Sequence, residues 1–173
     1  MSNLYYKYIG NKIINFPQIK MSNLVTNKIK ESVVEVLGLR DLGQLRDRFE
    51  GQAYLDQQIF KLHSYNASLN YLGLPTPEIS KEYIENFKPI IKRKNDMLVV
   101  VPFKFETLPK MKIMDYKQPR IFVLCSSERN YNIIGIASVE VLNDKSNYIN
   151  LDSKGKIGDF IGFNKTILQE INV

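Results

Sequence analysis

Three short apolar runs in the second half of the chain decide its fold: residues 98–103 (LVVVPF), 121–125 (IFVLC) and 133–139 (IIGIASV). Each run is rich in β-branched residues and almost uninterrupted in its apolar character. Runs of this kind are typical of strands that are covered on both faces. They predict at least three central strands of one sheet.

Amphipathic helices surround this strand cluster. Apolar side chains recur at intervals of three or four within residues 22–40 and again from about residue 50 to residue 72, and Gly38 and Gly73 end the two patterns. A last helix is expected from Asn164. This order of helices and strands predicts an α/β (α+β) fold, with a central mixed sheet of about four strands flanked by helices.

Length and composition favour a single globular domain. The chain has 173 residues, of which 44% are hydrophobic and 24% charged. We expect one domain over residues 22–173 and an N-terminal arm over residues 1–21, whose tyrosines become ordered on a partner protein. No stretch has the length of a membrane span or the pattern of a secretory signal, so we expect a cytoplasmic protein with no membrane partner.

Positive charge is concentrated in residues 88–120. This stretch holds nine basic residues against three acidic ones, and its excess equals the net charge of +6 of the whole chain. Basic residues gathered on one surface neutralise phosphates, which predicts a nucleic-acid partner. The alternative is a strand edge that lysines protect against pairing with other chains.

Familiar catalytic motifs are missing. The sequence contains no P-loop, no G-x-G-x-x-G, no H-E-x-x-H and no C-x-x-C. Its only cysteine, Cys125, lies in an apolar run, and its only histidine, His63, is expected on a helix surface or partly buried. Carboxylates therefore remain as the candidate metal ligands.

Three segments, taken in order, carry a family resemblance: residues 66–77 (NASLNYLGLPTP), 86–103 (NFKPIIKRKNDMLVVVPF) and 120–142 (RIFVLCSSERNYNIIGIASVEVL). Together they resemble the small PD-(D/E)xK nuclease-like proteins of phages and bacteria. The resemblance implies a restriction-endonuclease-like fold. It also implies a strand that carries the lysine, here Lys92, and a Mg²⁺ ion that activates water for phosphodiester hydrolysis.

The acidic positions of that family are altered in this chain. The helix glutamate corresponds to Asn66, and the acid two residues before the lysine corresponds to Ile90, on the same strand face as Lys92. Glu85 is the nearest acid that can stand in for the first aspartate. The resemblance thus implies Glu85 as metal ligand and Glu85 with Lys92 as catalytic residues, at a site where Asn66 and Ile90 replace the family's other acids.

The function predicted from the sequence is binding of nucleic acid, with DNA favoured over RNA, by a nuclease-like domain. Whether it acts as a Mg²⁺-dependent endonuclease stays open, because one carboxylate holds Mg²⁺ poorly. The alternative is a structural or assembly subunit whose basic face docks on an acidic partner. The residues expected to contact nucleic acid are Lys88, Lys92, Arg93, Lys94, Lys104 and Arg120.

Overall fold

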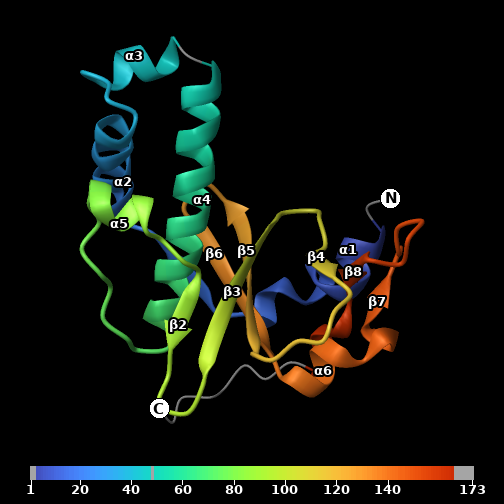
Figure 1. The fold of residues 1–173 in the computed structure, drawn as a ribbon. Helices are drawn as coiled ribbons and strands as arrows, with labels where there is room; N and C mark the ends of the chain where they lie inside the picture. Colours follow the sequence, from blue (N-terminus) through green and yellow to red (C-terminus); the bar gives the residue numbers. More distant parts are fainter. Residues whose placement is uncertain (1–2, 48, 166–173) are drawn as a thin grey trace.

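The computed structural model of the chain describes residues 3–47 and 49–165. It has a five-stranded sheet packed against helices and a separate three-stranded sheet (Figure 1). The predicted α+β class with a central mixed sheet is confirmed. The helix expected from Asn164 falls on residues that are almost all outside the described part, where the last element is the short η3 (Gly162–Lys165).

The large sheet has the strand order β1-β6-β5-β3-β2. Its strands β3 and β5 are parallel, and the other neighbours are antiparallel. Four of the strands match the four expected, and the sequence analysis missed β1. The five strands are β1 (Gln18–Lys20), β2 (Ile90–Lys92), β3 (Met97–Lys104), β5 (Arg120–Ser127) and β6 (Asn130–Ala137).

Both long predicted helices are confirmed, as α2 (Asn23–Val36) and α4 (Phe49–Tyr71). The Ser22 hydroxyl caps α2 by accepting a hydrogen bond from the Val25 N–H. Gly38 and Gly73 have φ angles of 65° and 69°, the left-handed conformation that ends a helix without a Cβ clash. Among the described residues, no helix is long and apolar enough to cross a membrane.

The helical layer lies on one face of the large sheet, which we call the helix face. Leu69 of α4 and Leu72, which follows the helix, pack there against strand residues such as Ile91, Val100 and Ile121. The short helices α3 (Leu42–Arg46) and α5 (Lys81–Glu85) complete this layer with α2. The N-terminal half of α4 extends past the end of the sheet and forms a protrusion with α2 and α3 (Figure 1).

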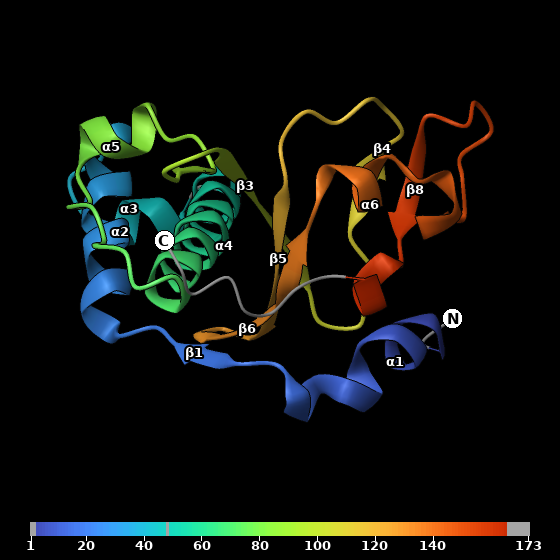
Figure 2. The same cartoon turned by 90° about the horizontal axis from the view of Figure 1, so that it is seen from below.

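The opposite face of the large sheet is covered, among the described residues, by other elements. Its cover consists of the N-terminal segment, α6 (Val139–Asn143) and the small sheet (Figure 2). The small sheet has the order β4-β8-β7, with strands β4 (Lys110–Lys112), β7 (Tyr148–Ile149) and β8 (Ile157–Phe160). The rings of Phe122 and Phe160 stack with centroids 4.6 Å apart, which joins the two sheets.

The expected N-terminal arm packs on its own chain. It forms α1 (Asn3–Tyr8), the 3₁₀ turn η1 (Gly10–Asn15) and β1. Tyr5 and Ile9 are 2% and 0% exposed, and both belong to the core that also contains Phe122. This packing counts against an arm that becomes ordered only on a partner.

Candidate functional site

The hairpin formed by β2 and β3 carries most of the basic residues singled out from the sequence. Lys92 pairs with Met97 across the hairpin. The turn between them is closed by Arg93, whose N–H donates to the Asp96 carbonyl and whose Nε and Nη2 each lie 2.6 Å from an Asp96 carboxylate oxygen. The Arg93 guanidinium is therefore engaged within its own turn, whereas Lys92 and Lys94 are exposed.

Strand alternation determines which way the β2 side chains point. Ile91 is 2% exposed and packs on the helix face. Ile90 and Lys92 must therefore point to the opposite face. The expectation that Ile90 and Lys92 lie on the same strand face is therefore confirmed.

Arg120 of β5 lies on the same face as Lys92. Ile90 is paired with Val99, and Val99 with Arg120, so a single row of side chains crosses three strands. From strand spacing, the Cα atoms of Lys92 and Arg120 are roughly 12 Å apart. We define the basic face as this end of the large sheet, with Lys92, Arg93, Lys94 and Arg120, together with Lys88, which precedes β2 in the chain.

Arg120 is held in place by its neighbours. Its guanidinium lies 4.8 Å from the centre of the Tyr116 ring, and its Nη1 donates to the Gln118 carbonyl at 2.8 Å. Burial lowers the pKa of Arg120, against the opposing effect of the Tyr116 and Tyr148 hydroxyls. Tyr116 is itself fixed, because its N–H donates to Oδ1 of Asn143 at 2.7 Å.

Lys104 does not belong to the basic face. It ends β3, an eight-residue strand that begins at Met97, so it lies roughly 23 Å from the turn of the hairpin. Its ammonium group lies 5.5 Å from the centre of the Phe60 ring of α4. Lys92, Arg93, Lys94 and Arg120 thus lie toward one end of the large sheet, Lys88 precedes β2 at the other end of that strand, and Lys104 is separate.

The expected catalytic pair of Glu85 and Lys92 is not brought to one side of the sheet. Glu85 belongs to α5 in the helical layer, where its carboxylate lies 3.8 Å from the Lys81 ammonium. Lys92 points away from that layer. Asn66 is 3% exposed within α4, so it too lies on the helical side.

A bound Mg²⁺ ion therefore does not fit at the expected positions. The Ile90 side chain offers no oxygen ligand beside Lys92, and Glu85 is on the other side of the sheet. Within residues 3–47 and 49–165, no three His, Cys, Asp or Glu side chains gather closely enough to hold a metal ion. We derive no hydrolytic step from these residues.

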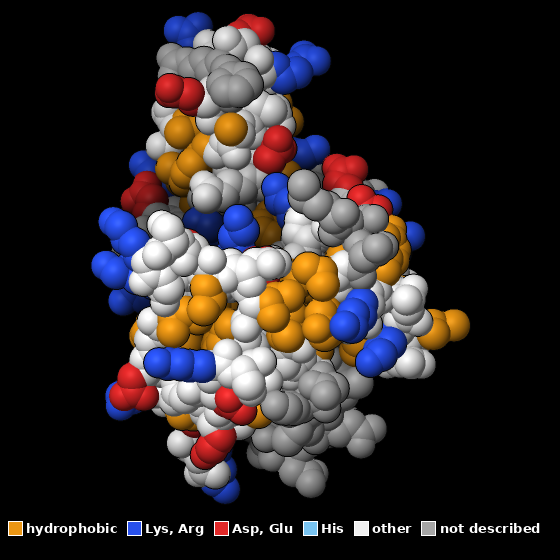
Figure 3. Space-filling model, turned by 90° about the vertical axis from the view of Figure 1, so that its right-hand side faces the viewer, with side chains coloured by type: hydrophobic (Ala, Val, Ile, Leu, Met, Phe, Trp, Pro, Cys, Tyr) orange, Lys and Arg blue, Asp and Glu red, His pale blue; other side chains and the backbone are white. Residues whose placement is uncertain are grey.

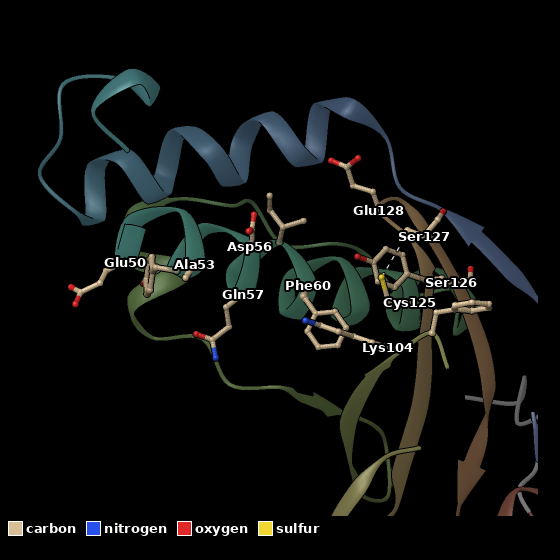
Figure 4. Close-up of a pocket in the computed structure, with 14 residues that line it drawn as sticks. Glu50, Ala53, Asp56, Gln57, Phe60, Lys104, Cys125, Ser126, Ser127 and Glu128 are labelled. Atoms are coloured by element: carbon tan, nitrogen blue, oxygen red, sulfur yellow. Dashed lines mark hydrogen bonds between the residues drawn. The ribbon is translucent and has the colours of Figure 1, made fainter. Parts of the chain in front are cut away.

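A second site lies at the other end of β3, where a groove of about 1220 Å³ separates α4 from the ends of β3 and β5 (Figure 4). We call it the α4 groove. Its floor is aromatic and apolar, with Phe60 of α4, Tyr131 of β6 and Phe105, which is 45% exposed. Figure 3 shows a hollow below the helical protrusion, with acidic, basic and hydrophobic side chains around it.

The two reactive side chains near this groove are both held in uncharged forms. The Cys125 thiol donates to the Ser127 carbonyl at 3.2 Å, and burial raises its pKa. His63 is 0% exposed, and its Nε2 lies 3.1 Å from the Thr26 hydroxyl. Burial lowers the pKa of His63 to about 4. These environments do not suit a thiolate nucleophile with a histidine base.

His63 is more deeply buried than expected. Its sequence position predicts a helix surface or a partly buried site. In the structure it lies between α4, α2 and β6, with its ring edge-on to Tyr131 at 5.6 Å. Tyr131 of strand β6 covers His63. The periodicity of the helix sequence cannot reveal a contact with a residue so distant in the chain.

The sequence analysis also missed the α4 groove. Glu50, Ala53, Gln57 and Phe60 recur at intervals of three and four residues, so they form a second stripe along α4. That spacing was available in the sequence. The contact between Phe60 and Lys104 could not be read from the sequence, because the two residues are 44 positions apart.

We also compared the chain with known proteins. It matches no protein family model, no curated protein and no solved structure.

Proposed function

We propose that this chain binds nucleic acid through the basic face. The observation that carries the proposal is the row of paired residues from Ile90 through Val99 to Arg120, which places Arg120 on the same sheet face as Lys92, two residues along β2 from that row. Exposed Lys88 and Lys94 lie beside this row in the chain. Cations spaced along one surface neutralise successive phosphates and release their counterions.

Protection of a strand edge explains only part of this charge. Strand β2 is an edge strand of the large sheet, and lysines on an edge discourage pairing with other chains. Arg120 lies on β5, an interior strand two positions from that edge. Its partly buried guanidinium on Tyr116 contributes nothing to edge protection, but a planar fork of donors suits a phosphate group.

The test is a salt titration of binding to single- and double-stranded DNA and to RNA. The test variant is K92Q/K94Q, and K154Q/K156Q, which removes two exposed lysines from the β7–β8 connection, is the matched control. We expect K92Q/K94Q to reduce the slope of log K against log salt by about two and the control to leave it unchanged. An absence of binding at low salt, or an equal reduction by both variants, contradicts the proposal.

The same titration, repeated with Mg²⁺, tests cleavage. We expect the chain to bind DNA and RNA without cleaving them, because Glu85 and Lys92 lie on different sides of the sheet. Cleavage that K92A abolishes without weakening binding would instead support the catalytic role that the family resemblance implies.

One observation favours a second function, an assembly subunit that docks on an acidic protein. Met97 is 43% exposed and is paired with Lys92, so an apolar side chain lies within the basic face. A protein partner would bury Met97, whereas phosphates would not. M97S should weaken binding to such a partner and leave nucleic-acid binding unchanged.

A further inference from the structure

The α4 groove is an elongated surface along one side of helix α4. Along α4 it extends from Glu50 to Phe60, which is roughly 15 Å at the helical rise per residue. This length matches about three turns of a second helix. Phe60, Phe105 and Tyr131 leave an apolar end where a large side chain of a ligand can be buried.

The charged residues of the groove are mainly acidic. Glu50, Asp56 and Glu128 line it, and Lys104 is its one lining cation among the described residues. Asp56 accepts a hydrogen bond from the neutral Gln52 amide at 2.9 Å, so its charge is not cancelled. Phosphates would be repelled by three carboxylates, which makes this groove unsuitable for nucleic acid.

We propose that the α4 groove binds a basic amphipathic helical segment of a partner protein. An apolar side chain of that segment is buried between Phe60 and Phe105. Its lysines or arginines lie near Glu50 and Glu128, at the two ends of the groove. Peptide helices commonly bind in this way, with apolar anchors in a groove and complementary charge at its rim.

Cys125 provides a direct reporter, because it lines the groove and is the only cysteine of the chain. The probe is a 14-residue peptide of leucine and lysine in an amphipathic helical pattern, and the control replaces every lysine with glutamate. Alkylation of Cys125 by iodoacetamide is followed by mass spectrometry. We expect the lysine peptide to slow alkylation at least about fivefold, and the glutamate peptide to have no effect.

Matched variants test the role of charge. E50Q/E128Q should require about tenfold more lysine peptide for the same protection at low salt. E31Q/E35Q, which removes two exposed carboxylates from α2 outside the groove, should not change the requirement. Fluorescence anisotropy of the labelled peptides gives an independent readout if the free thiol reacts slowly.

Three outcomes overturn the proposal. The first is equal protection by both peptides, which would mean that apolar contact alone drives binding. The second is no protection and no anisotropy change with the lysine peptide. The third is protection that rises with protein concentration without any peptide, because a second copy of the chain would then occupy the groove. Nucleic-acid binding at the basic face can succeed or fail independently of all three.

Discussion

The two ends of strand β3 lead to surfaces of opposite character. At the Met97 end, the basic face presents Lys92 and Arg120 on the same face of the sheet. At the Lys104 end, the α4 groove presents aromatic rings and three carboxylates. The comparison shows that a run of charge in the sequence need not form one surface, because an eight-residue strand can carry its two ends to different neighbours.

The largest expected effect comes from weakening the strand that both surfaces share. Phe103 of β3 is 4% exposed, and its ring stacks on Phe163 at 6.1 Å. F103A should lower the free energy of unfolding by about 3 to 5 kcal/mol, because it removes a buried ring and leaves a cavity. Urea denaturation measures this loss. F103L is the control and should cost less than half as much; a loss below about 1 kcal/mol for F103A would contradict the packing.

The next largest effect is acid destabilisation through His63. The pKa of His63 is lowered from 6.5 to about 4, first by burial, with Arg129 acting in the same direction and the Glu128 backbone opposing. Between these values the unfolded chain binds more protons than the folded chain. Stability is therefore full above pH 6.5 and falls as pH decreases toward 4, by about 3 kcal/mol in total.

This pH effect should distinguish the two surfaces. His63 packs against Tyr131, which lines the α4 groove, and the basic face is at the other end of the sheet. Hydrogen exchange at pH 5 should increase first near the groove. Urea denaturation of H63Q at pH 7 and pH 5 provides the control. In this variant the free energy of unfolding should change much less between the two pH values than in the wild type. A wild-type stability that does not change between pH 6.5 and 5 would contradict the burial of a neutral His63.

A smaller effect is expected when Arg120 is changed without loss of charge. R120K keeps one cation but loses the planar fork and its contact with Tyr116. We expect nucleic-acid affinity to fall about fivefold, which corresponds to ~1 kcal/mol, with no change in the salt slope. Y116F keeps the ring and should bind as the wild type does. If R120K changed the slope instead, Arg120 would not act as a positioned guanidinium.

The smallest effect is expected at Lys104. This residue was among those predicted to contact nucleic acid, yet it lies over Phe60 in the α4 groove. K104Q should leave the affinity for nucleic acid and its salt slope unchanged, and it should increase lysine-peptide binding slightly, because it removes the cation of the groove. Fluorescence anisotropy with both ligands measures the two responses. If K104Q lost as much nucleic-acid affinity as K92Q, the basic face and the α4 groove would have to act as one binding surface, which would contradict this prediction.

Local signals in the sequence were sufficient for much of the fold. The helix-ending glycines Gly38 and Gly73 and the apolar strand runs have physical causes that act within a few residues. Strand β1 has three residues, too few for a recognisable apolar alternation, and β4, β7 and β8 have only three, two and four residues. Such strands form because a neighbouring strand supplies hydrogen bonds, which no local pattern encodes.

The candidate sites depend even more on distant contacts. The row from Ile90 through Val99 to Arg120 requires the parallel pairing of β3 with β5, and the sequence does not specify this register. The α4 groove likewise requires Lys104 to reach Phe60. The sequence therefore predicted residue types that suit phosphate binding, but it could not separate Lys104 from the other five.

Lysine footprinting in the presence of DNA tests the central claim most directly. Surface lysines are acetylated with and without a DNA duplex at low salt, and mass spectrometry reports the modification of each lysine in one experiment. The account predicts protection of Lys88, Lys92 and Lys94, with Lys104, Lys154 and Lys156 modified as in the free protein. Protection of Lys104 with an unprotected hairpin, or uniform protection of all six, would contradict it.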